Sequence, residues 1–85
     1  MVKARIIVRY KPGILDPEGK TIYDALRSLG FEKVEGVETG KYFEITFAGD
    51  VDKNKAKELT TDACERLLAN PVIQNYSFEI VEGDR

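Results

Sequence analysis

The feature that most constrains the fold is a stretch near the C-terminus where a helical pattern stops and a strand pattern begins. Residues 67–69 close a run of apolar residues at helical spacing. Asn70 tolerates the left-handed backbone that ends many helices, and Pro71 cannot continue a helix. From Tyr76 to Ile80 apolar and polar residues alternate, which is the period of a half-buried strand. A helix that must turn back at once into a strand predicts a small layered α+β domain.

The size and charge of the chain limit the functions that it can have. Its 85 residues predict a single domain spanning residues 1–85, which buries only about 60–65% of the surface of its unfolded chain. The net charge is −2, with acidic and basic residues interspersed, which argues against a nucleic-acid partner. No apolar run approaches the roughly 20 residues of a membrane helix, and no signal-peptide pattern is present. We therefore expect a cytoplasmic protein without a membrane or nucleic-acid partner.

The residue types that are missing argue against catalysis. The sequence contains no histidine, which removes the commonest general base near neutral pH and the commonest zinc ligand. Its single cysteine, Cys64, is most simply a small buried apolar residue, because a reactive thiol needs an exposed, cationic setting. We therefore expect no catalytic residue, no bound cofactor and no metal in this chain.

The first part of the chain predicts a strand followed by a helix. Residues 2–11 alternate between apolar and mostly basic side chains. Asp16 followed by Pro17 is a typical helix start, because an acidic N-cap precedes a proline where its missing N–H costs nothing. The helix is expected over residues 17–29, with Gly30 as its end. Its expected inward-facing residues are Ile22, Ala25, Leu26 and Leu29.

The rest of the chain predicts two strands, a second helix and a last strand. A short strand is expected at residues 34–37, a stronger one at 42–47 and a helix at 52–69. The inward-facing residues of that helix are expected to be Ala56, Leu59, Ala63 and Leu67. The order β-α-β-β-α-β predicts an α+β two-layer sandwich with both helices on one face of a mainly antiparallel four-stranded sheet. In the ferredoxin-like form of this order the first strand lies in the middle, and the thin core favours a dimer.

The outer face of such a sheet would carry matched charges. Outward-facing residues of the first strand are basic (Lys3, Arg5 and Arg9), whereas Glu44 and Glu79 point outward from the later strands. Opposite charges that face each other across strands contribute about 0.2–1 kcal/mol per pair. This face is either plain solvated surface or a surface that meets a partner.

Four blocks of sequence, taken together, resemble one known family. They are residues 11–19 (KPGILDPEG), 29–31 (LGF), 37–42 (VETGKY) and 67–73 (LLANPVI), the last followed by Tyr76, Phe78, Glu79 and Ile80. Their order and spacing resemble the PurS family, the small subunits of phosphoribosylformylglycinamidine synthase. The resemblance covers nearly the whole chain.

The resemblance implies a role in a complex of de novo purine biosynthesis. That complex converts formylglycinamide ribonucleotide to the formylglycinamidine, using ATP, Mg and ammonia released from glutamine. The PurS-like chain would be a non-catalytic adaptor between the synthetase subunit PurL and the glutaminase subunit PurQ. It would also associate with itself as a dimer or a tetramer. Its physical role would be to hold two active sites in register, so that ammonia passes between them without loss to water.

Exposed loops on a rigid scaffold carry recognition more often than core positions do, so two segments are predicted to meet partners. The candidates are Pro12, Gly13, Leu15, Asp16, Pro17 and Gly19 around the first helix start, and Gly40, Lys41 and Tyr42 in a later turn. The alternative is that these residues only shape a turn and cap a helix, which is slightly favoured for Asp16 and Pro17. Tyr42 favours an interface, because tyrosine on an outer sheet face is a typical anchor.

Other functions fit the sequence less well. A ferredoxin-like regulatory domain that binds a small metabolite at a dimer interface is the main alternative. An RNA-binding sheet is disfavoured, because Tyr42 follows Lys41 where the RNA-binding pattern has glycine. A stand-alone enzyme built on carboxylates is disfavoured, because no paired acids have a neighbour that would separate their pKa values.

Overall fold

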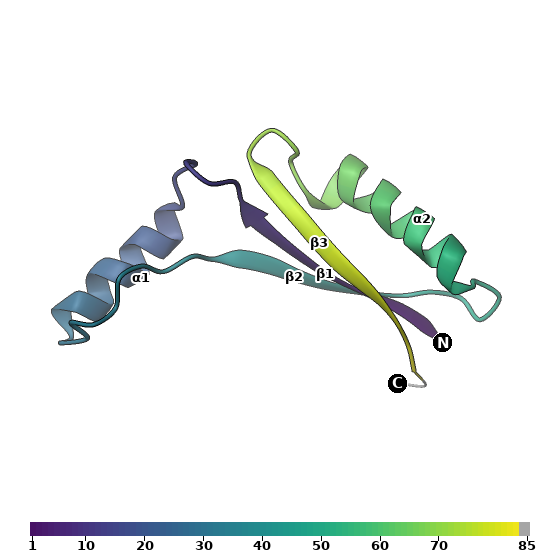
Figure 1. Ribbon diagram of the computed structural model, residues 1–85, viewed down its shortest axis with the longest axis horizontal. Helices are drawn as coiled ribbons and strands as arrows, with labels where there is room; N and C mark the ends of the chain where they lie inside the picture. The colour runs from purple at the N-terminus through teal and green to yellow at the C-terminus, as the bar shows by residue number, and fades with distance from the viewer. Residues whose placement is uncertain (84–85) are drawn as a thin grey trace.

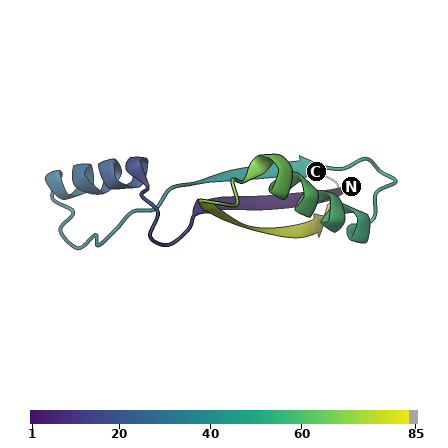
Figure 2. The ribbon, with the colours of Figure 1, turned by 90° about the horizontal axis from the view of Figure 1, so that it is seen from above.

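The computed structural model describes residues 1–83 and shows an elongated α+β chain measuring 51 × 29 × 14 Å. Its elements are β1 (Val2–Tyr10), α1 (Pro17–Ser28), β2 (Gly40–Thr46), α2 (Lys53–Ala63), the π-helical turn η1 (Cys64–Leu68) and β3 (Gln74–Glu82). The three strands form a sheet with α2 beside it, whereas α1 stands beyond one end of the sheet (Figures 1 and 2).

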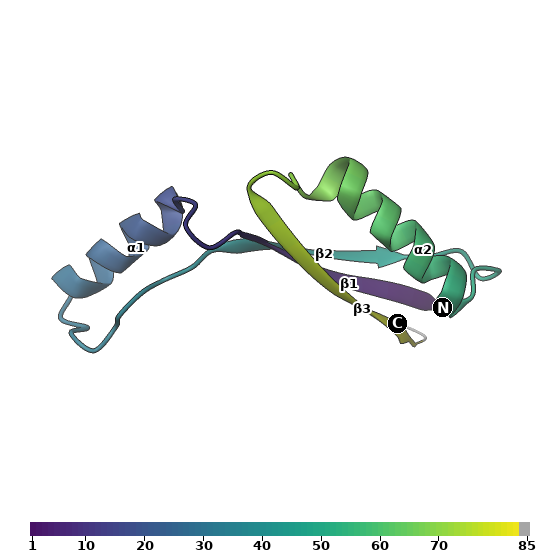
Figure 3. The same ribbon diagram turned by 45° about the horizontal axis from the view of Figure 1, so that its top comes forward.

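The sheet is antiparallel, and its strand order is β2-β1-β3. β1 is central, as predicted from the sequence, and its apolar residues Val2, Ala4, Ile6 and Val8 are all buried. The prediction of four strands is wrong for the described residues, which form three. Residues 34–37 form no strand, because this segment returns beside α1 rather than along the sheet (Figure 3). The Arg27 guanidinium fixes that course by donating to the carbonyl oxygen of Glu32 at 2.7 Å.

α2 packs on β1 and β3, and only part of the stripe predicted from the sequence is buried: the prediction holds for Ala56 and fails for Leu59 and Leu67. The buried residues are Ala56, Thr60 and Cys64, whereas Leu59 is 37% exposed and Leu67 is 81% exposed. Ala56 and Thr60 have short side chains and are both fully buried, whereas the spacing of the leucines had favoured Leu59 and Leu67. In η1 the N–H of Ala69 donates to the Cys64 carbonyl at 3.1 Å, an i→i+5 bond that turns the last residues relative to an α-helix.

The end of the second helix also differs from the prediction. Asn70 does not adopt the left-handed conformation, since no described residue other than glycine has a positive φ. Its side-chain oxygen accepts instead from the N–H of Val72 at 3.0 Å, and its own N–H donates to Gln74 Oε1 at 2.8 Å. Asn70 therefore shapes the turn into β3 through side-chain hydrogen bonds.

The prediction that both helices cover one face of the sheet is wrong for this chain. α1 begins and ends as predicted, with Asp16 as N-cap, Pro17 in the first turn and Gly30 at φ +98° just past its end. It makes almost no contact with the sheet, however (Figures 1 and 2). The returning segment that follows α1 stays close to it. We call residues 17–37, which form this projecting unit, the arm.

Candidate protein-interaction site

Asp16 lies at the corner where the arm meets the sheet. One carboxylate oxygen accepts from the N–H of Gly19 and from the hydroxyl of Thr39, both at 2.8 Å. The other oxygen accepts from the N–H of Thr39 at 2.7 Å. The start of α1 and the residue before β2 are thus held by one side chain. The Thr39 N–H, followed by that of Gly19, holds the pKa of Asp16 below its usual range.

Two glycines permit the close packing at this corner. A Cβ atom on Gly19 would lie 2.6 Å from the carbonyl oxygen of Val37, and a Cβ on Gly40 would lie 2.6 Å from that of Val8. Both distances are below ordinary contact, so a larger residue at either position would displace backbone. We call these four residues the corner: Asp16, Gly19, Thr39 and Gly40.

The structure brings only some of the predicted interface residues together. Asp16, Gly19 and Gly40 meet at the corner, where Asp16 and Pro17 have the local capping role considered above. Pro12 and Gly13 line a groove of about 450 Å³ that opens between the ends of the strands and the corner. Arg9, Lys11, Glu38 and Asn75 are among the other residues of this groove. Leu15 is 67% exposed, so it is available to a partner. A partner contact at these residues stays a prediction.

Lys41 and Tyr42 lie in β2 rather than in a turn, and their side chains point to opposite faces of the sheet. Lys41 is opposite Val8 on the face that α2 partly covers, whereas Tyr42 is opposite Ile7 on the outer face. Tyr42 is 59% exposed and its hydroxyl lies 3.2 Å from the Glu44 carboxylate. Desolvation and that hydrogen bond raise the pKa of Tyr42.

The outer face carries the charge ladder that the sequence predicts. Lys3 lies 3.7 Å and Arg5 3.4 Å from Glu44, and Arg5 lies 3.8 Å from Glu79. Tyr42 and Ile7 form an apolar centre beside these ion pairs. Because the pairs are partly exposed, each contributes about 0–1 kcal/mol to stability.

The arm has an exposed apolar surface, and two of its residues, Ile22 and Leu29, were predicted from the sequence to face inward. Leu29 is 74% exposed, Phe31 is 54% exposed and Ile22 is 39% exposed. The amphipathic spacing correctly indicated an apolar face on this helix. Spacing alone does not say whether the covering surface belongs to the same chain or to another one.

A second incompletely covered surface lies on the inner face of the sheet. α2 packs on β1 and β3, which leaves the β2 side of this face without a helix. Phe43, Ile45 and Phe47 point to this face and are only half-buried. The inner strip, as we call these three residues, is an apolar surface of the kind that protein contacts cover.

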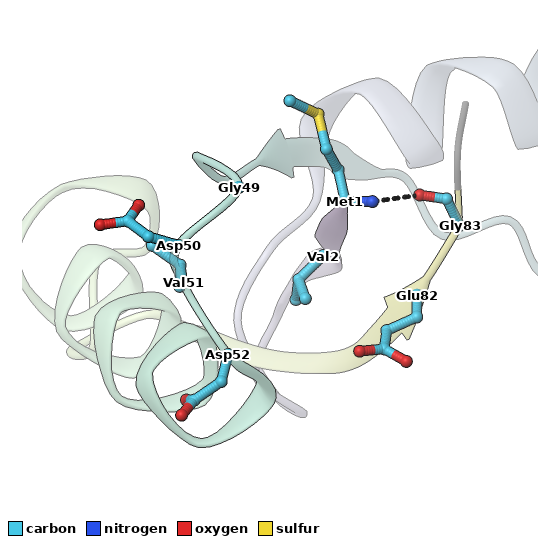
Figure 4. Close-up of a pocket in the computed structure, with 8 residues that line it drawn as sticks. All are labelled: Met1, Val2, Gly49, Asp50, Val51, Asp52, Glu82 and Gly83. Atoms are coloured by element: carbon cyan, nitrogen blue, oxygen red, sulfur yellow. Dashed lines mark hydrogen bonds between the residues drawn. The ribbon is translucent and has the colours of Figure 1, made fainter.

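A shallow pocket of about 500 Å³ at the opposite end of the sheet contains three carboxylates, but they do not converge. Figure 4 shows the side chains of Asp50, Asp52 and Glu82 pointing apart. Asp52 caps α2 by accepting from the N–H of Lys55 at 2.8 Å, and the terminal ammonium of Met1 donates to the Gly83 carbonyl at 2.7 Å. Among residues 1–83 no group of three or more acidic, cysteine or histidine residues is placed to hold a metal. This pocket therefore lacks the geometry of a cation site.

Cys64 is fully buried, and burial raises the pKa of its thiol, which disfavours the nucleophilic thiolate. No helix in the described part of the chain is long and apolar enough to cross a membrane.

A small α+β domain with a projecting helical arm, exposed apolar residues on that arm and a half-covered inner strip has the features of a protein-interaction domain. A family model described as PurS, phosphoribosylformylglycinamidine (FGAM) synthase, matches residues 3–82. The chain therefore belongs to the PurS family.

Individual relatives resemble the chain over almost its full length. The phosphoribosylformylglycinamidine synthase subunit PurS of Methanocaldococcus jannaschii is 44% identical, with 94% of this chain and 95% of that protein covered. The Bacillus subtilis subunit PurS is 37% identical over 96% of this chain and 95% of its own length.

Solved structures show the same likeness. The crystal structure of M. jannaschii PurS superposes with a TM-score of 0.87 at 40% identity, covering 99% of this chain and all of the other. A chain in the structure of PurLQS from Thermotoga maritima gives a TM-score of 0.73 at 30% identity, covering 95% of this chain and 99% of that chain.

Proposed function

We propose that this chain is the adaptor subunit of a phosphoribosylformylglycinamidine synthase, bridging a synthetase subunit (PurL) and a glutaminase subunit (PurQ). The observation that carries the proposal is the match to a chain of the T. maritima PurLQS structure over 99% of that chain. A fold that superposes from end to end can present the same surfaces to the same kinds of partner.

The chemistry of such a complex explains why a subunit without catalytic groups is useful. Ammonia released from glutamine must reach the synthetase site before it is lost to water. A subunit that fixes the relative position of the two sites lowers that loss without contributing a reacting group. ATP, Mg and glutamine would then bind to the larger subunits. The cytoplasmic location expected from the sequence fits this role and stays a prediction.

We also infer that the chain associates with itself through the arm. The arm and the inner strip are both apolar, and within one chain neither covers the other. In a two-fold dimer each arm would pack on the inner strip of the other chain, so that both pairs of surfaces are buried at once. A domain of this size gains stability from such burial, since its own core is thin.

Size-exclusion chromatography tests the adaptor role directly. This chain is mixed with PurL and PurQ of the same organism in the presence of glutamine and ADP. The elution profile of this mixture is compared with that of each two-component mixture. We expect one ternary peak that contains all three subunits and that is absent when this chain is left out. Separate elution of all three components would contradict the proposal.

A further inference from the structure

We propose that the corner is a lock that holds α1 away from its own sheet and thereby directs its apolar face to a second copy of this chain. The inference rests on the self-association proposed above and adds the reason for it. It assigns to Asp16 a positioning role that decides which chain covers the arm.

The lengths of the connections do not explain why α1 stands apart. Residues 11–16 join β1 to α1, and residues 29–39 join α1 to β2. In compact α/β units, connections of about two to six residues suffice to lay a helix back on its sheet. A closed form with α1 beside α2 is therefore within reach of this chain, and something else must oppose it.

The corner opposes the closed form, because the carboxylate of Asp16 ties the end of the first connection, residues 11–16, to the end of the second, residues 29–39. Thr39 donates twice to Asp16, and Gly40, the next residue, is held in register opposite Arg9 of β1. The N–H of Gly19 donates to the same carboxylate from within α1. If α1 swung back over the sheet, Asp16 would have to leave Thr39, because Thr39 is fixed by the strand that follows it.

The other end of the first connection is also held. The N–H of Lys11 donates to the Ile73 carbonyl at 2.9 Å, and the N–H of Ile14 donates to the Lys11 carbonyl at 3.1 Å. The connection is thus anchored both at the end of β1 and at Asp16.

The arm itself is braced, so any rotation would occur at the corner. Arg27 donates to the carbonyl oxygens of Glu32 at 2.7 Å and Val34 at 3.5 Å, which ties the end of α1 to the returning segment. Gly19 packs against Val37 from the other end. An arm that keeps its shape but loses Asp16 can then place its apolar face on the inner strip of its own chain.

The test compares Asp16→Ala and Thr39→Val with Asp52→Ala as a matched control. Asp52 is the N-cap of the other helix, and among the described contacts its carboxylate bonds only to the N–H of Lys55, so the loss of that carboxylate weakens a cap without touching the corner. Thr39→Val keeps the side-chain shape and both backbone hydrogen bonds to Asp16, and it removes only the hydroxyl bond. It therefore serves if Asp16→Ala fails to fold, which circular dichroism checks.

Two readouts separate the lock from the dimer. Sedimentation equilibrium gives the dimer dissociation constant. Electron paramagnetic resonance gives the distance within one chain, from spin labels on Ser28→Cys and Lys57→Cys diluted into excess unlabelled protein. The buried Cys64 stays unlabelled under native conditions, which labelling of the parent chain verifies.

The lock predicts that Asp16→Ala and Thr39→Val weaken the dimer at least tenfold and shift the label distance to shorter values, while Asp52→Ala leaves both unchanged. An unchanged distance in Asp16→Ala and Thr39→Val, whether or not the dimer weakens, overturns the lock. A monomeric parent chain would instead refute the self-association. The distance between the labels would still test the lock: a long distance in the parent and a short one in Asp16→Ala supports it, and a short distance in both overturns it.

Discussion

Replacing Leu29 with serine should weaken self-association strongly while leaving the fold of the single chain intact. Leu29 follows the last residue of α1 and is 74% exposed, so within one chain its side chain contributes little burial. If the arm packs on a second copy, the same side chain becomes buried at the interface. Only the dimer then loses its contribution.

The size of the effect follows from the exposed fraction. Full burial of a leucine side chain is worth about 1.5–3 kcal/mol. Since 74% of Leu29 remains to be buried, each copy contributes roughly 1–2 kcal/mol at the interface. A two-fold dimer contains two copies, so the variant should lose roughly 2–4 kcal/mol, or about 30- to 1,000-fold in dissociation constant.

Sedimentation equilibrium over a range of concentrations measures this constant for the parent chain, Leu29→Ser and the control Ser28→Asn. Ser28 is the neighbouring exposed residue on another side of the helix, and a polar exchange there removes no apolar surface. We expect the control to match the parent within about threefold, or 0.7 kcal/mol. A change of less than threefold in Leu29→Ser would refute the assignment of the arm to the interface.

Three further predictions concern stability. Thr60→Val should raise the free energy of unfolding by about 1–2 kcal/mol, because the buried Thr60 hydroxyl has no hydrogen-bond partner among residues 1–83. Thr61→Val, whose exposed hydroxyl donates to the Lys57 carbonyl, should be neutral or slightly destabilising, and chemical denaturation compares the two variants. Gly19→Ala should destabilise by about 1–3 kcal/mol despite the better helix propensity of alanine, because its Cβ would lie 2.6 Å from the Val37 carbonyl oxygen, and an increase in melting temperature would contradict this. The pKa of Asp16 is lowered in the folded chain, so its contribution to the free energy of unfolding is complete above the pKa of an unfolded aspartate and is lost as pH falls through the lowered value. Asp16→Asn should therefore show a smaller fall in unfolding free energy on acidification than the parent chain, and chemical denaturation at several pH values measures both.

The sequence predicted well those features that depend on local patterns. The alternation along β1 gave the buried face, and the Asp16–Pro17 pair gave the start of α1, because capping and pleating are set by neighbouring residues. The cross-strand pairing of Arg5 with Glu44 was also confirmed, since charges on a central strand need partners on its neighbours.

Features that depend on distant contacts were predicted less well. The apolar spacing of α1 was correct, but its position was not, because the hydrogen bonds from Thr39 to Asp16 join residues far apart in sequence. The inward face of α2 was predicted correctly at Ala56 but not at Leu59, because the side chain that is buried there belongs to the neighbouring Thr60. The π-helical turn that begins at Cys64 changes the side of the helix on which Leu67 lies, and no local sequence pattern predicted this turn.

The candidate site was also predicted only where it depends on neighbouring residues. The predicted loop residues include Asp16 and Gly19, for which the structure gives a clear local role. The exposed apolar residues Ile22 and Leu29 of the arm were predicted to face inward, because their spacing is that of a core face. An amphipathic helix left without a cover becomes recognisable only when the whole fold is known.

The measurement that tests the adaptor role most directly is a reconstituted assay of formylglycinamidine formation. PurL and PurQ of the same organism are assayed with and without this chain, once with glutamine and once with ammonium as the nitrogen source. We predict that glutamine-dependent turnover requires this chain, whereas turnover with ammonium does not. Equal glutamine-dependent rates in its presence and absence would contradict the adaptor role.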